Sequence, residues 1–310
     1  MKTALSEEIT GTAFMASSTT VLSTEQAARP ALQLPATALR TVFAGILLVI
    51  AFWPILTGIY GSWFDEHAYM EHGSLVLPAA AFIAWTKRSE LRRISLQPSK
   101  IGFALVFMGA LQAVLGIAAH WVWISRIAFL ISLIGCIVGL YGFRVARALA
   151  YPLGMLPLMI APPTFLYAKA TLSLQLLASR LGESCLEFLG FSVLREGNVL
   201  HLVGMTLSVE EACSGIRSLF AILFICAVYN YLFVQGTKPR LFLFVMALPI
   251  AILGNGARIV ATGIASQYNQ ALVYGTPHEM FGYASVIFAC AGCICLHRVL
   301  LVARRRLEFK

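Results

Sequence analysis

Long apolar runs, separated by short polar connections, make up most of this chain. They occur at about 41–60, 74–86, 101–123, 127–143, 149–168, 213–234, 241–265 and 279–302. Because a helix needs about 20 apolar residues to cross a bilayer, this pattern predicts an all-α membrane protein, a polytopic bundle of about eight transmembrane helices. The run at 74–86 is short and the run at 149–168 contains several prolines, so we expect these two to be tilted, broken or partly interfacial.

The composition supports this interpretation. Of the 310 residues, 59% are hydrophobic and 12% are charged, against about 25% charged in an ordinary soluble domain. A soluble enzyme is therefore excluded. The net charge of +9 fits cytoplasmic loops, where Lys and Arg accumulate, and we expect no nucleic-acid partner.

The cysteines and acidic clusters indicate no disulfide framework and no metal. Most cysteines lie inside apolar runs, where thiols usually pack as small hydrophobic groups: Cys136, Cys226, Cys290, Cys293 and Cys295. The outer-loop pattern His67 to Glu71-His72 is one residue longer than the zinc pattern H-x-x-E-H. We assign no cofactor and no metal.

The distribution of Lys and Arg predicts the topology. With the N-terminus in the cytoplasm, nearly all basic loop residues fall on the inner side, and both termini are expected inside. We expect a disordered cytoplasmic tail at 1–38, a transmembrane domain at 39–303 with one large outer excursion at 169–212, and a basic cytoplasmic tail at 304–310.

The outer excursion has two predicted parts. Its first part places polar and charged residues at helical spacing opposite many leucines, which favours a small amphipathic helix on the outer membrane surface. In its second part, Phe191 to Leu194 and Val199 to Val203 flank the turn-rich Arg195-Glu196-Gly197-Asn198, which predicts a β-hairpin.

Three polar positions stand at the outer ends of predicted spans. Cys213 opens the sixth span, Arg258 lies near the outer end of the seventh, and His278 immediately precedes the eighth. Asn255 is three residues before Arg258, so the two share a helix face. Because charged groups in a bilayer are costly, such residues are candidates for function.

The chemistry of these positions is complementary. A helix N-terminus, an arginine or a protonated histidine lowers a thiol pKa and favours the nucleophilic thiolate, and Cys213 could have all three. Gly215 permits close backbone approach, and first-turn amides could bind an oxyanion. The roles of three neighbouring residues are left open by the sequence. Glu211 is a candidate cap or charge partner, Ser214 a rival nucleophile, and Arg217 a substrate or structural contact. Taken singly, each residue is more often structural.

Three motifs together make the family recognisable. The runs EEACSGIRS at 210–218, GNGARIV at 254–260 and PHEMFGY at 277–283 resemble the signature of the exosortase/archaeosortase family. The stretch from Trp53 to Pro78, with Tyr69 and His72-Gly73, also resembles the entry to that family's core. The resemblance covers about residues 45–300.

The resemblance implies a bacterial inner-membrane cysteine protease or transpeptidase with its active site at the periplasmic face. The implied enzyme is expected to cut a PEP-CTERM-like C-terminal sorting signal through a thioester. Its catalytic residues map onto Cys213, Arg258 and His278. The implied partners are exported proteins with a hydrophobic C-terminal signal, membrane lipid, and a surface polysaccharide or lipid-linked acceptor. The alternative from another class is an anion transporter or channel, in which Arg258 and His278 line a polar path.

Overall fold

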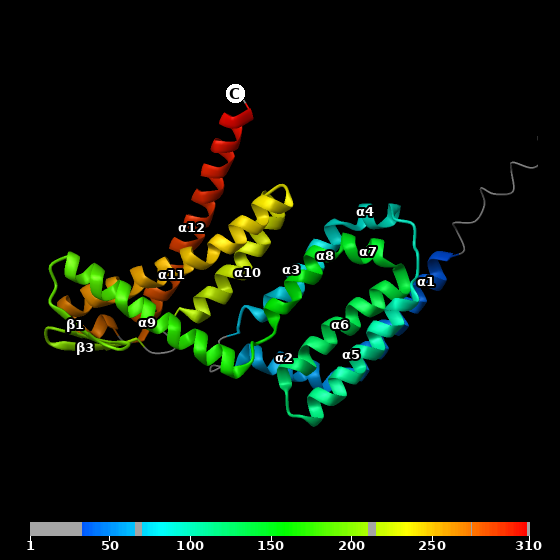
Figure 1. The fold of residues 1–310 in the computed structure, drawn as a ribbon, viewed down its shortest axis with the longest axis horizontal. Helices are drawn as coiled ribbons and strands as arrows, with labels where there is room; N and C mark the ends of the chain where they lie inside the picture. The colour runs from blue at the N-terminus through cyan, green and yellow to red at the C-terminus, as the bar shows by residue number, and fades with distance from the viewer. Residues whose placement is uncertain (1–32, 66–69, 210–214, 274, 309–310) are drawn as a thin grey trace, which may run out of the picture. The chain divides into compact units, whose positions relative to one another are not determined.

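A computed structural model describes residues 33–65, 70–209, 215–273 and 275–308. The chain divides into two compact units, Met1–Leu47 and Leu48–Lys310. The first unit contributes most of α1 (Gln33–Ala51). All other elements belong to the second unit, of which Figure 1 labels the helices α2–α12 and the strands β1 and β3.

Among the described residues, five helices are long and apolar enough to cross a membrane, or up to six spans if the bent pair α1 and α2 (Trp53–Phe64) counts as one. The five are α5 (Lys100–Ala118), α6 (Val122–Tyr141), α10 (Ile216–Phe233), α11 (Thr237–Tyr268) and α12 (Gly275–Glu308). An all-α membrane protein is thereby confirmed, whereas the predicted count of eight spans is not.

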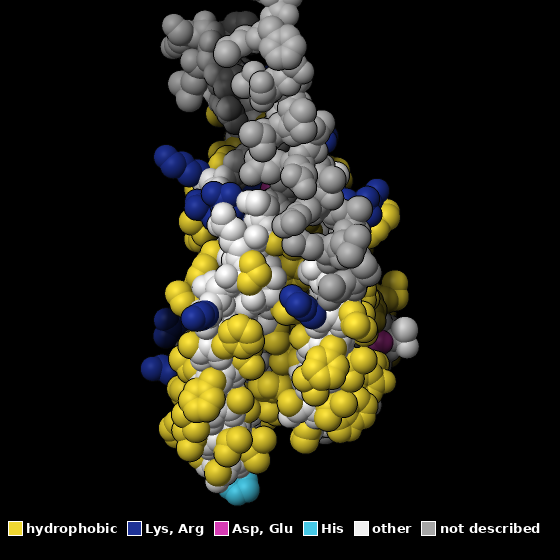
Figure 2. Space-filling model, turned by 90° about the vertical axis from the view of Figure 1, so that its right-hand side faces the viewer, with side chains coloured by type: hydrophobic (Ala, Val, Ile, Leu, Met, Phe, Trp, Pro, Cys, Tyr) yellow, Lys and Arg dark blue, Asp and Glu magenta, His cyan; other side chains and the backbone are white. Residues whose placement is uncertain are grey.

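The outer surfaces of these helices are apolar. Large side chains on α5 are exposed, among them Phe103, Phe107, Leu111 and Val114. Hydrophobic side chains cover much of the face seen in Figure 2. A soluble protein rarely exposes so continuous an apolar surface, so these helices fit a lipid environment.

The two remaining predicted spans are short or broken. Helix α3 (Gly73–Thr86) has 14 residues, which span about 21 Å against a hydrocarbon core of about 30 Å. The run at 149–168 divides into α8 (Ala150–Met155), the 3-10 turn η1 (Leu156–Met159) and the beginning of α9 (Thr164–Phe188). Prolines remove the backbone donors that a continuous helix needs here. Two short basic helices, α4 (Arg88–Arg93) and α7 (Phe143–Ala148), complete this part.

The segment after Pro163 contains a long helix and a small sheet. Helix α9 (Thr164–Phe188) packs on α11 through small and polar residues, including Ala178, Ser179 and Gly182. The strands β1 (Val193–Glu196), β2 (Val199–Leu202) and β3 (Met205–Ser208) form one antiparallel sheet in that order. The prediction of a two-stranded hairpin therefore differs from the structure, because β3 adds a third strand and the first turn contains only Gly197 and Asn198.

The sheet and α9 share a hydrophobic core with α11. Leu200, Leu202 and Leu207 from the sheet pack with Leu186 of α9 and Ile259 of α11. Ile259 directly follows Arg258, so this core fixes the rotation of α11 about its axis at the candidate site.

Candidate functional site

Helix α11 holds two of the predicted site residues in its buried face. Arg258 is 9% exposed and Asn255 is 3% exposed. Their neighbours Gly254 and Gly256 lie close to other helices, Gly254 to Ser285 and Ala289 of α12 and Gly256 to Leu181 of α9. The absence of side chains at these glycines lets α9 and α12 approach α11 closely on either side of the polar pair.

The Arg258 guanidinium lies against the first turns of α12. A Cβ atom at Gly282 would lie 3.5 Å from both Cζ and Nη2 of Arg258. Gly282 follows His278 by four residues on the same helix, so the two positions share a face of α12. The structure thus directs Arg258 toward the α12 face that carries His278.

Asn255 lies against the beginning of α10. Gly215 is the N-cap of α10 and has the left-handed φ of 81°. A Cβ atom there would lie only 2.5 Å from Asn255 Cγ, a separation that no side chain could adopt without displacement. A small cavity bounded by Leu174 and Ala178 of α9 adjoins this contact. The backbone two residues after Cys213 in sequence is therefore in direct contact with α11.

The first turn of α10 is also tied to the loop before α3. Arg217 Nη2 donates to Glu71 Oε1. His72 stacks on Phe220 with ring centroids 5.9 Å apart, and its Nε2 donates to the Leu158 carbonyl oxygen at 3.1 Å. Burial of the His72 ring lowers its pKa, and the bond to Leu158 opposes this effect. A neutral imidazole therefore links η1, α3 and α10.

Sequence reasoning missed the structural role of this histidine. In the sequence, His72-Gly73 contributes to the family resemblance, and His72 stands in a loop whose spacing does not fit a zinc site. A Cβ atom at Gly73 would lie 2.4 Å from Trp63 Nε1, and the same Nε1 donates to the Met159 carbonyl oxygen at 3.0 Å. The sequence feature that indicates a structural role for His72 is a polar residue beside a glycine at the edge of an apolar run.

The structure describes some of the predicted site residues and not others. Glu211, Cys213 and Ser214 lie outside the described residues. His278 belongs to α12, although its side chain lies outside the described part. Gly215, Asn255, Arg258 and the His278 face of α12 are brought together, whereas the meeting of thiol, guanidinium and imidazole stays a prediction. Among the described residues there is no group of three or more His, Cys, Asp or Glu able to hold a metal ion.

These features define a helical membrane protein in which the buried Asn255 and Arg258 lie where α10, α11 and α12 meet. The sequence model of the transmembrane exosortase family matches residues 63–296, and the chain belongs to this family. Comparison with curated proteins and with solved structures gives no match. The resemblance drawn from the three motifs is thereby confirmed at the level of the family.

Proposed function

We propose that this protein is a membrane-embedded cysteine protease or transpeptidase that cleaves the C-terminal sorting signal of exported proteins. The observation that carries the proposal is the position of Arg258, whose guanidinium lies against Gly282 on the His278 face of α12. Its neighbour Asn255 contacts Gly215, two residues after Cys213. Two residues of extended chain span at most about 7 Å, which supports a thiol close to Asn255.

The proposed reaction is acyl transfer. The Cys213 thiolate attacks a backbone carbonyl carbon of the substrate and forms a tetrahedral oxyanion. Arg258 stabilises the oxyanion, a role whose loss costs roughly 2.7–4 kcal/mol. The C–N bond breaks, His278 protonates the departing amine, and a thioester stays on Cys213. Water or a nucleophile on another molecule then gives its proton to His278 and attacks the thioester, the C–S bond breaks, and the Cys213 thiolate is released.

The substrate is proposed to approach through the bilayer. Its apolar C-terminal helix would lie beside the apolar surfaces of the spanning helices, with its polar cleavage motif at the junction of α10, α11 and α12. We place this junction at the periplasmic face of a bacterial inner membrane, because the opposite helix ends carry most of the Lys and Arg.

The decisive experiment compares cysteine variants in cells that export a reporter with a C-terminal sorting signal from the same organism. We expect Cys213→Ala to leave the reporter at full length at unchanged protein level. Cys185→Ala on α9 and Cys290→Ala on α12 are the matched controls and are expected to process it normally. A thioester or alkylated adduct on Cys213, identified by mass spectrometry, would establish the nucleophile. Continued processing by Cys213→Ala would refute it.

A further inference from the structure

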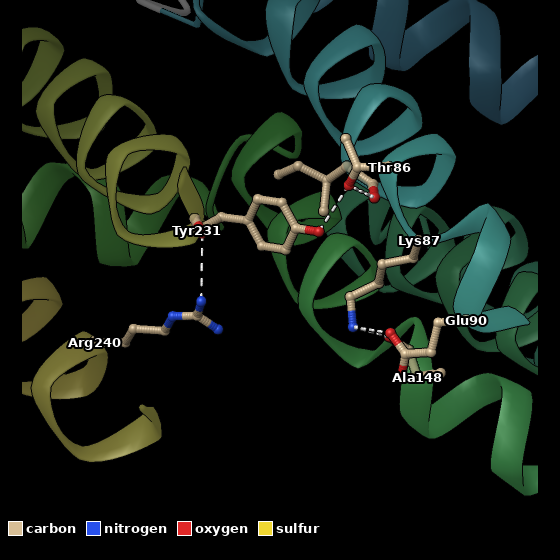
Figure 3. Close-up of polar contacts among 7 residues, drawn as sticks. Thr86, Lys87, Glu90, Ala148, Tyr231 and Arg240 are labelled. Atoms are coloured by element: carbon tan, nitrogen blue, oxygen red, sulfur yellow. Dashed lines mark hydrogen bonds and ion pairs between the residues drawn. The ribbon is translucent and has the colours of Figure 1, made fainter. Parts of the chain in front are cut away.

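A second polar region lies at the opposite end of α11 from the candidate site. Arg240 is in the first turns of α11, 18 residues before Arg258, a separation of roughly 27 Å along a helix axis. Figure 3 shows this region, where Arg240, Tyr231, Thr86 and Lys87 connect α11, α10 and α3. Nothing in the proposed reaction uses these residues.

A cavity of about 330 Å³ opens beside Arg240, a volume in the range of small-ligand sites. Its wall is mainly apolar and includes Met155 and Pro157 from the proline-rich segment and Leu241 and Phe244 from α11. Arg240, Asn230, Thr237 and Tyr151 supply the polar groups. The cavity therefore combines an apolar wall with a few polar groups, one of them positively charged.

The Arg240 guanidinium is held in a fixed position with one edge available. Its Nε donates to the carbonyl oxygens of Val234 at 2.8 Å and Asn230 at 3.2 Å, and its Nη2 donates to that of Tyr231 at 3.3 Å. Asn230 Nδ2 in turn donates to the Arg240 carbonyl oxygen at 3.0 Å. Within the described residues, the two N–H groups of Nη1 donate to no acceptor.

The segments that connect the helices at this end of the bundle are rich in Lys and Arg. Tyr231 Oη shares a hydrogen bond of 2.8 Å with Thr86 Oγ1, and the adjacent Lys87 Nζ donates to the Ala148 carbonyl oxygen at 2.8 Å. These contacts bring the ends of α3, α7 and α10 together. Their connecting segments, 87–100, 144–151 and 231–240, contain one acidic residue, Glu90, and the basic residues Lys87, Arg88, Arg92, Arg93, Lys100, Arg144, Arg147, Lys238 and Arg240.

We propose that this cavity binds an anionic phospholipid. A phosphate oxygen accepts from Arg240 Nη1, and an acyl chain lies along the apolar wall toward Met155 and Pro157. Inorganic phosphate has no apolar part that could pack on the apolar wall. A zwitterionic lipid has no net charge, so its attraction to the excess of positive charge is weaker than that of an anionic lipid. The bound lipid joins α8, α10 and α11 at the basic end of the bundle, independently of the reaction at Arg258.

The test measures lipid binding to the full-length protein purified in detergent. Native mass spectrometry and thermal unfolding are followed while phosphatidylglycerol, phosphatidylcholine with the same acyl chains, or inorganic phosphate is added. We expect phosphatidylglycerol to bind roughly fivefold more tightly than phosphatidylcholine, the factor expected for one arginine near an anionic headgroup. Only the lipids should raise the melting temperature, phosphatidylglycerol more strongly.

Two variants with matched controls locate the site. Gly154 lines the cavity, and a Cβ atom there has no heavy atom within 4 Å, so Gly154→Leu fills the cavity without a clash at Cβ and should abolish lipid stabilisation. Gly61→Leu on α2, where a Cβ also meets nothing within 4 Å, is its control. Arg240→Gln should remove the preference for phosphatidylglycerol, whereas Arg92→Gln on α4 should retain it.

Three results would overturn the proposal: equal binding of the two lipids, an equal thermal shift with inorganic phosphate, or unchanged phosphatidylglycerol binding by Gly154→Leu. Because Arg240 also caps the end of α10, Arg240→Gln could unfold the protein, and Gly154→Leu then decides the outcome. Reporter processing is not the measured quantity, so the result is independent of the proposed reaction.

Discussion

Gly215 shows how a single residue determines the approach of two helices. Its left-handed backbone and its contact with Asn255 both exclude a side chain. A residue with a Cβ atom in the left-handed region costs about 1–2 kcal/mol, and overpacking a close contact costs about 1–3 kcal/mol more. The two costs can be separated because Gly190 has a φ of 87° with nothing within 4 Å of its Cβ position.

We therefore expect Gly215→Ala to lower the melting temperature more than Gly190→Ala does. Both variants have the backbone cost, whereas only the first forces Asn255 away from α10. Thermal unfolding of each purified variant in the same detergent gives the comparison. Equal shifts would contradict the contact between Gly215 and Asn255.

The sequence predicted some residues of the site and not others. Arg258 and Asn255 were identifiable because polar residues inside an apolar run are costly unless they have a role. Arg240 stands in a short basic connection of the sequence, and nothing local shows that its guanidinium turns back onto the carbonyl groups of α10. The structural role of His72 could not be predicted, because its partners Leu158 and Phe220 are far away in sequence.

At the scale of the element, α5 and α6 form a hairpin joined through small residues. Gly102, Gly109 and Gly116 recur at every seventh position of α5. A Cβ atom at Gly109 would lie 2.2 Å from Ser132 Oγ, and one at Gly102 would lie 2.1 Å from the Gly139 backbone nitrogen. Close backbone approach through small residues is the usual means of helix association in lipid.

Gly109→Leu should accordingly separate α5 from α6. We expect a large fall in melting temperature and faster proteolysis of the connection at residues 119–121, because the side chain cannot enter the space held by Ser132 and Ala128. Gly61→Leu introduces the same side chain on α2 without a close neighbour and should change the melting temperature little. Similar stability of the two variants would show that the hairpin does not depend on this contact.

Element prediction succeeded where an apolar run was long and failed where prolines divided it. The runs at 101–123 and 127–143 correspond to α5 and α6 within a few residues. The run at 149–168 became two short elements and the first turn of α9, because composition reports hydrophobicity but not where a proline ends a helix. The strand β3 is not predicted by the sequence, since Met205–Ser208 is too short to show a clear alternation of apolar and polar residues.

At the scale of the whole molecule, the basic residues predict an orientation in the membrane. The β1–β2 turn at Gly197 and the α10–α11 connection at Gly236 are both exposed, and they are predicted to lie on opposite sides of the bilayer. An epitope tag inserted at either site should therefore differ in its access to an external protease.

In spheroplasts we expect the tag at residues 197–198 to be cleaved and the tag at residues 235–236 to be protected until the cells are lysed. Normal reporter processing by both insertions serves as the folding control. The reverse pattern would place the junction of α10, α11 and α12 on the cytoplasmic side and would contradict the proposed periplasmic reaction.

The length of α11 has a consequence for the choice of membrane. Its 32 residues extend over about 48 Å, well beyond a hydrocarbon core of about 30 Å. Even a strongly tilted α11 therefore continues into a headgroup layer, and the distance between Arg240 and Arg258 nearly equals the thickness of the core. The helix is therefore matched to a particular bilayer thickness. In a bilayer of that thickness both guanidinium groups reach hydrated layers at once, whereas a thicker bilayer would place one of them in hydrocarbon.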